Sequence, residues 1–65
     1  MLKYMPMSGK DMAKLFFKAG WVERHQKGSH LVVVHPNGRH ESIPQHKELG
    51  KGLERKLLKT LEETK

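Results

Sequence analysis

The stretch His-Leu-Val-Val-Val-His-Pro-Asn-Gly-Arg, residues 30–39, decides the fold. Its three consecutive valines favour extended backbone, because β-branched side chains have few rotamers and fit a pleated surface. Pro36-Asn37-Gly38 then favours a tight turn, since proline presets one turn residue and glycine accepts a positive φ. The stretch therefore predicts a strand over residues 30–35, a hairpin and an antiparallel return strand over residues 39–43.

One more strand is expected before this hairpin. Residues 21–26, Trp-Val-Glu-Arg-His-Gln, begin apolar and turn polar, and residues 27–29 break the strand because Gly28 can take a positive φ. At the far end, Pro44 is expected to end the last strand. Turns this short join neighbouring strands antiparallel, so the three segments predict a three-stranded meander.

An amphipathic helix is expected before the first strand. Ser8 is a typical N-cap residue, and Asp11 occupies the capping-box position. Apolar residues follow with the i, i+3, i+4, i+7 spacing of a helix, namely Met12, Leu15, Phe16 and Ala19. Gly20 suits the left-handed position after a helix, so the sequence predicts a helix over about residues 9–19.

A second helix is expected after the sheet. Gly50 and Gly52 disfavour helix, so it should begin near Lys51 or Gly52. Its apolar stripe consists of Leu53, Leu57, Leu58 and Leu61. The element order is α-β-β-β-α, which predicts an α+β fold: a three-stranded antiparallel sheet with both helices on one face.

The other face of the sheet would then be open. Along the central strand one face carries His30, Val32 and Val34 and the other carries Leu31, Val33 and His35. Apolarity alone does not decide which set faces the core. Either a partner covers the valines on the solvent side, or a small sheet simply has an apolar central strand that needs no partner.

Length and composition limit the classes of protein. The 65 residues suffice for one small domain, residues 1–65, with residues 1–7 as a lead-in that has no clear period. The absence of cysteine excludes disulfides, thiolate metal sites and cysteine nucleophiles. No apolar run approaches 18 residues and no signal-peptide core is present, so we expect a cytoplasmic protein with no membrane association. Nothing in the sequence indicates a cofactor.

The charge is strongly positive. Thirteen Lys and Arg oppose seven Asp and Glu, a net of +6 with histidine neutral. Residues 1–46 carry seven basic and three acidic side chains, +4, and residues 47–65 carry six and four, +2. A basic surface spread along the whole chain attracts polyanions, of which nucleic acid is the commonest, although it can also serve only solubility.

His30 is a candidate catalytic residue, although a lone Gly-Ser-His turn is also typical of a histidine with no catalytic role. It follows a tight turn at the start of a strand, where the sheet holds it rigidly while leaving it accessible. Histidine exchanges protons near neutral pH. Arg24 and Lys27, with the backbone amides of Gly28 and Ser29, are candidates to hold a phosphate beside it.

The remaining histidines suggest no metal site. Four of the five are spaced by five residues, at His25, His30, His35 and His40, and an odd spacing alternates between the faces of a strand. A metal would need three or four converging ligands, and no Asp or Glu completes a cage. We therefore expect no metal, and interpret most of these histidines as surface side chains.

Two further features have alternative interpretations. Trp21 and Phe16 could stack on bases, but Trp21 directly follows a helix end and is expected to pack that helix on the sheet. Lys10, Lys14 and Lys18 line one side of the first helix. Such a stripe is usually only a solvated face, but here it could also contact phosphate.

The sequence resembles the HicA-type toxins, also called the YcfA-like family, which are small mRNA interferases of type II toxin–antitoxin pairs. The resemblance spans about residues 8–61. It is carried by Ser8-Gly9-Lys10, Lys18-Ala19-Gly20-Trp21, Arg24-His25-Gln26-Lys27-Gly28-Ser29-His30, His35-Pro36-Asn37-Gly38-Arg39, Ile43-Pro44 with His46, and Gly52-Leu53. His25, where many relatives have another residue, and the short loop at residues 45–49 depart from the family pattern.

This resemblance implies a fold similar to a double-stranded-RNA-binding domain and an endoribonuclease that cleaves mRNA without a metal. It implies that His30 is the catalytic residue and that a HicB-type antitoxin is the inhibiting partner. The basic side chains would position the RNA, and the RNA 2′-OH is the simplest nucleophile. Two alternatives remain: a non-catalytic RNA-binding module of the same fold, and a domain whose ligand is a protein.

Overall fold

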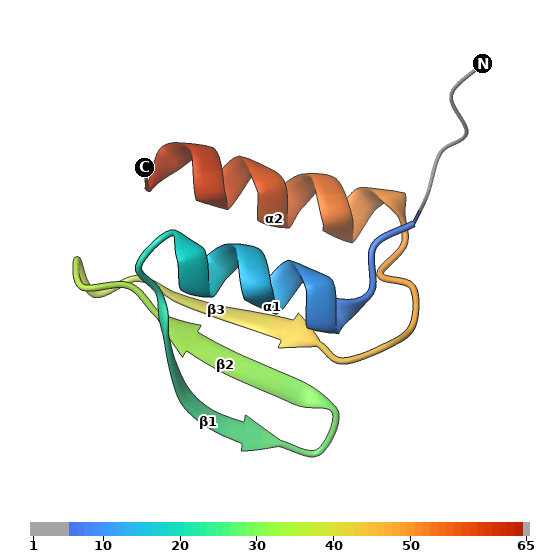
Figure 1. Cartoon of the computed structure of the whole chain (residues 1–65), viewed down its shortest axis with the longest axis horizontal. Coiled ribbons are helices and arrows are strands. Elements are labelled where there is room, and N and C mark those ends of the chain that lie inside the picture. The colour runs from blue at the N-terminus through green and yellow to red at the C-terminus, as the bar shows by residue number, and fades with distance from the viewer. Residues whose placement is uncertain (1–5, 65) are drawn as a thin grey trace.

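The computed structural model describes residues 6–64 and confirms the predicted element order (Figure 1). The elements are α1 (Gly9–Lys18), β1 (Val22–Lys27), β2 (His30–Val34), β3 (His40–Pro44) and α2 (Lys51–Glu63). Most of the predicted lead-in, residues 1–5, lies outside the described residues. The rest of it is attached to the domain, because Met7 packs against the core.

The ends of α1 follow the predicted signals. The Ser8 hydroxyl accepts a hydrogen bond of 3.1 Å from the Asp11 backbone N–H, as an N-cap does. At the other end, Gly20 has φ +97°, the left-handed conformation that glycine adopts without strain. The helix ends at Lys18, one residue before the predicted end, and the chain turns directly into β1.

The sheet has the strand order β1-β2-β3, with both pairs antiparallel. The hairpin between β2 and β3 is closed by two hydrogen bonds of 2.8 Å, from His35 N–H to the Arg39 carbonyl and from Gly38 N–H to the His35 carbonyl. Pro44, expected to end β3, is instead its last residue. An edge strand tolerates a proline there, because one side of its backbone needs no partner.

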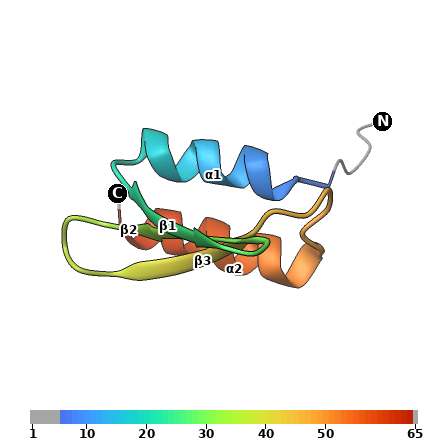
Figure 2. The same ribbon diagram turned by 90° about the horizontal axis from the view of Figure 1, so that it is seen from below.

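The structure shows which face of β2 is buried. Leu31 and Val33 are 5% and 0% exposed and form the core with Ile43, Phe16 and Leu57. Figures 1 and 2 show α1 lying over one face of the sheet, roughly along β3, with α2 running beside α1 next to β3. Within residues 6–64 no helix lies against the opposite face, which carries His30 and the half-buried Val32 and Val34.

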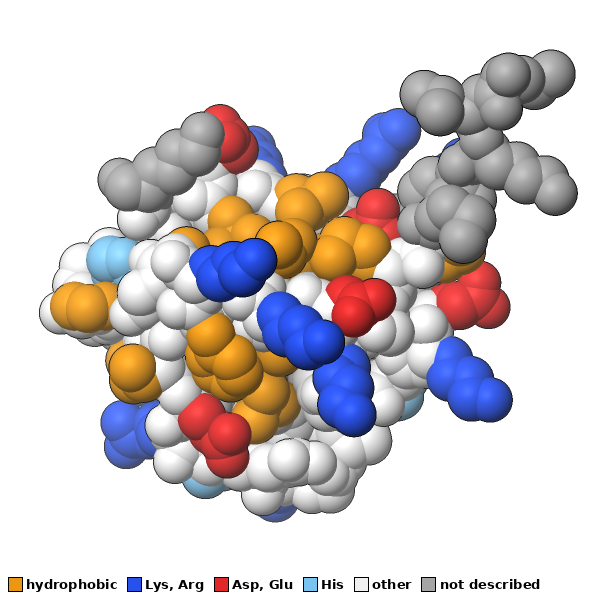
Figure 3. All heavy atoms as spheres, in the orientation of Figure 1, with side chains coloured by type: hydrophobic (Ala, Val, Ile, Leu, Met, Phe, Trp, Pro, Cys, Tyr) orange, Lys and Arg blue, Asp and Glu red, His pale blue; other side chains and the backbone are white. Residues whose placement is uncertain are grey.

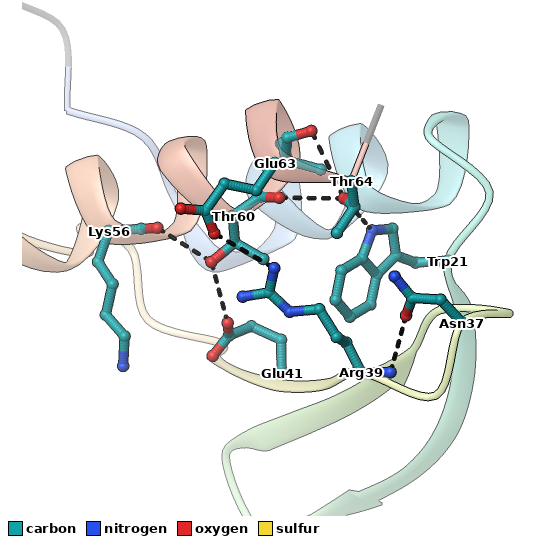
Figure 4. Close-up of polar contacts among 9 residues, drawn as sticks. Trp21, Asn37, Arg39, Glu41, Lys56, Thr60, Glu63 and Thr64 are labelled. Atoms are coloured by element: carbon teal, nitrogen blue, oxygen red, sulfur yellow. Dashed lines mark hydrogen bonds and ion pairs between the residues drawn. The ribbon is translucent and has the colours of Figure 1, made fainter.

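Trp21 joins both layers of the fold. Its side chain is 1% exposed. Its ring makes T-shaped contacts with the rings of Phe16 and His35, at centroid distances of 4.9 Å and 5.3 Å. Its indole N–H donates to the Thr64 hydroxyl over 3.3 Å (Figure 4). The expectation that Trp21 packs the first helix on the sheet is confirmed, and base stacking by Trp21 and Phe16 is wrong because both rings are buried.

The buried side of α2 is more polar than the leucine stripe predicted. Leu57 is fully buried, but Leu58 is 37% exposed, and Glu54 and Thr60 are buried. The Glu54 carboxylate accepts a hydrogen bond from the Met7 N–H at 3.0 Å. The Thr60 hydroxyl donates to a carboxylate oxygen of Glu41 in β3 (Figure 4). These hydrogen bonds satisfy polar groups that burial would otherwise destabilise.

Gly9 and Gly52 are both helical glycines, but replacing them by alanine should have opposite effects. A Cβ on Gly9 would collide with the Pro44 carbonyl oxygen, whereas one on Gly52 meets nothing within 4 Å. Gly9→Ala should lower the free energy of unfolding by about 1–3 kcal/mol, and Gly52→Ala should raise it by up to about 1 kcal/mol. Thermal unfolding followed by circular dichroism measures both. Equal midpoints for the two variants would contradict the close contact at Gly9.

Candidate functional site

The tight turn between β1 and β2 presents His30 to solvent. Gly28 takes φ +59° in this turn, as the sequence predicts. Lys27 and His30 close the turn as directly paired residues, and His30 pairs on its other side with Pro44 of β3. Paired residues of an antiparallel sheet project to the same face. Lys27 and His30 are both exposed, so an ammonium group and an imidazole lie next to each other on the open face.

The open face of the sheet carries one lysine, three histidines and no carboxylate at its paired positions. Its paired positions form three rows across the strands: Lys27–His30–Pro44, His25–Val32–Ser42 and Val22–Val34–His40. None of these positions is acidic. The acidic residues of the strands, Glu23 and Glu41, both pair with Val33 and therefore belong to the core face. At these paired positions no carboxylate competes with an anion that approaches His30.

Arg24 lies in an irregular part of β1. The pairing shifts between Glu23 and His25, so Arg24 is the extra residue of a β-bulge and has no Cα partner on β2. A bulge bends its strand and redirects side chains. Arg24 is exposed and lies three residues before Lys27 along the strand. Arg24 therefore lies on the strand that leads to the turn, and the bulge frees its side chain from the regular alternation of the strand.

The turn is held in place by the chain that leaves β3. The Gln45 N–H donates to the Ser29 carbonyl over 2.6 Å, which continues the β2–β3 pairing past the end of the strands. The Gln26 side-chain amide donates to the Gly28 carbonyl over 3.3 Å. These two hydrogen bonds, accepted by the Ser29 and Gly28 carbonyls, stabilise the turn. Ser29 therefore has a structural role through its backbone carbonyl.

Lys10 and Lys14 lie apart from the other predicted site residues. Both are exposed on α1, on the side opposite its buried residues Met12 and Phe16. Figure 3 shows basic side chains crossing the face that carries the helices, with apolar side chains on either side of them. His30 belongs to the opposite face of the sheet. The structure brings Lys27, Gly28, Ser29 and His30 together and places the two α1 lysines on another surface.

The remaining histidines do not converge. No group of three or more His, Cys, Asp or Glu that could hold a metal ion occurs among residues 6–64. His35 is occupied structurally, because its Nδ1 accepts a hydrogen bond from the Asn37 N–H and its ring contacts Trp21. The sequence analysis missed this contact, although His35 shares the face of Leu31 and Val33.

In the described part of the chain, no helix is long and apolar enough to cross a membrane.

The family of the chain follows from comparison with known proteins. Residues 9–62 match the family described as the HicA toxin of bacterial toxin–antitoxin systems. A search of curated proteins found no significant match. The matched segment begins at the first residue of α1 and stops one residue before the end of α2, so it covers all three strands and the turn that carries His30. The chain therefore belongs to the HicA toxin family of toxin–antitoxin systems.

Proposed function

We propose that this toxin is a metal-independent endoribonuclease that cleaves mRNA and that His30 is its catalytic residue. The observation that supports the proposal most strongly is the pair formed by His30 and Lys27. The pair is exposed, stands at a fixed turn, and lies on a sheet face whose paired positions hold no carboxylate. A proton-transfer group beside a cation is what cleavage of a phosphodiester requires.

The RNA itself supplies the nucleophile in the simplest mechanism. A general base takes the proton of a 2′-OH, the 2′ oxygen forms a bond to phosphorus, and the bond from phosphorus to the 5′ oxygen breaks. A general acid gives the leaving 5′ oxygen a proton. The products are a 2′,3′-cyclic phosphate and a 5′-OH, and His30 performs one of the two proton transfers.

The residues around His30 would bind the phosphate. Lys27 offers an ammonium group on the same face, and Arg24 offers a guanidinium that can reach the backbone of the RNA. The N–H groups of Gly28 and Ser29 are further donors at the turn. Lys10 and Lys14 would contact phosphates farther along an RNA that passes from the open face around to α1.

A toxin of a toxin–antitoxin pair has an antitoxin as its partner, and we propose a HicB-type protein for this role. The open sheet face fits such a partner, since it combines His30 with Val22, Val32 and Val34. Val22 is 57% exposed, the largest exposed fraction among the large apolar side chains described. A protein that buried these valines would cover His30 and exclude RNA.

Replacing His30 by alanine should abolish RNA cleavage and toxicity without unfolding the protein. His30 is exposed, so we expect the free energy of unfolding to change by less than about 0.5 kcal/mol. Loss of general acid–base catalysis should lower the cleavage rate by at least about 100-fold. The measurement is cleavage of RNA by purified protein in EDTA, together with bacterial growth on expression. His25→Ala, on the same face but paired with Val32, is the matched control.

Two outcomes of this experiment would contradict the proposal. If His30→Ala cleaved RNA as fast as the unmodified chain, His30 would not be catalytic. If the unmodified chain bound RNA in EDTA without cleaving it, the protein would be an RNA-binding module with the same fold.

Replacing Lys27 should weaken RNA binding mainly by removing one phosphate contact. In the His30→Ala background, Lys27→Ala should lower the affinity several-fold and reduce the slope of log K against log salt by about 1. Lys59→Ala, which removes an exposed lysine of α2, is the control and should change neither quantity. Fluorescence anisotropy with a labelled RNA between about 50 and 200 mM salt measures both. An identical slope for the two variants would show that RNA does not contact the turn.

A further inference from the structure

His46 approaches the same turn from the other side. The regular pairing ends with His30 opposite Pro44, and the hydrogen bond from Gln45 N–H to the Ser29 carbonyl adds one more paired position. Continuing the register by one residue places His46 opposite Gly28. Diagonal neighbours in such a sheet lie about 7–8 Å apart between Cα atoms. His30 and His46 are therefore diagonal neighbours on the open face, next to the turn whose amides are proposed to bind the phosphate.

The backbone of His46 is fixed by α1. Its carbonyl accepts a hydrogen bond of 2.8 Å from the Gly9 N–H, at the point where Gly9 has no room for a Cβ against Pro44. The His46 side chain is exposed, and within residues 6–64 neither of its ring nitrogens takes part in a hydrogen bond. The backbone is thus held while the imidazole remains free for chemistry.

The other histidines do not fit this position. His40 pairs with Val34 at the far end of the sheet, four residues or about 13 Å from Pro44 along the strand. His35 is engaged by Asn37 and Trp21. His25 is also a diagonal neighbour of His30. It lies on the edge strand β1 opposite Val32, however, and is farther along the strand from the glycine turn.

We propose that His46 is the second proton-transfer residue of this site, an inference that rests on the proposed ribonuclease function. In-line attack puts the 2′ oxygen and the leaving 5′ oxygen on opposite sides of phosphorus. One imidazole cannot serve both positions in a single step, whereas two imidazoles that flank the phosphate can. One of the pair His30 and His46 removes the 2′-OH proton, and the other protonates the 5′ oxygen as its bond to phosphorus breaks.

The first test compares His46→Ala with His30→Ala and with His25→Ala, which is the same substitution at the other diagonal neighbour of His30. We expect both His46→Ala and His30→Ala to slow RNA cleavage in EDTA by about 10²- to 10⁴-fold and His25→Ala to change it less than about threefold. All three should keep the thermal midpoint, because His46→Ala retains the backbone hydrogen bond to Gly9. His46→Gln, which keeps a polar side chain, should be as slow as His46→Ala.

The second test separates the acid from the base. An RNA oligonucleotide with sulfur in place of the bridging 5′ oxygen at the mapped cleavage position has a leaving group that departs without a proton. The variant that lacks the general acid should cleave this RNA nearly as fast as the unmodified chain, and the variant that lacks the general base should remain slow. Recovery of one of the two variants and not the other supports the proposal.

Two results would overturn it, and they differ from failure of the proposed function. A cleavage rate of His46→Ala equal to that of His25→Ala, with His30→Ala inactive, would leave the ribonuclease intact and remove the role of His46. Recovery of neither variant on the sulfur-containing RNA would show that His46 only positions other groups. An unchanged rate for His30→Ala would instead contradict the proposed function itself.

Discussion

The fold depends on a close backbone contact between Gly9 and the segment that follows β3. The Gly9 N–H donates to the His46 carbonyl over 2.8 Å, and a Cβ at Gly9 would collide with the Pro44 carbonyl. Only glycine permits this approach. The next hydrogen bond, from Gln45 to Ser29, extends the contact to the β1–β2 turn. The start of α1, the end of the sheet and the turn that carries His30 are thereby held as one unit.

This constraint lets a small domain keep its core on one face of the sheet and leave the other face open. The core occupies one face of the sheet, where Trp21, Phe16 and Leu57 are almost completely buried. The opposite face contributes little to that core and is free to carry a cation, an imidazole and exposed valines. A rigid strand beneath His30 keeps its backbone fixed while its side chain stays in water, which is the arrangement that surface catalysis on a long polymer needs.

Local signals predicted the elements, and long-range contacts determined the rest. The valines of β2, the turn at residues 36–38 and the cap at Ser8 each act within a few residues, so the sequence predicted the order and most of the bounds. It could not decide the buried face of β2, because His30, Val32 and Val34 are as apolar as the opposite set. The bulge at Arg24 depends on pairing with β2, and the polar core contacts of Glu54 depend on a distant N–H at Met7.

The spatial arrangement of the proposed site residues was predictable only in part, for the same reason. Lys27, Gly28, Ser29 and His30 are consecutive, and the turn brings them together. The separation of Lys10 and Lys14 from His30 follows only from the packing of α1.

Identification of the RNA ends produced in EDTA tests the central claim most directly. Attack by the 2′-OH predicts a 2′,3′-cyclic phosphate and a 5′-OH, which mass spectrometry distinguishes. A 3′-OH with a 5′-phosphate would show that water attacks instead, and would contradict the account.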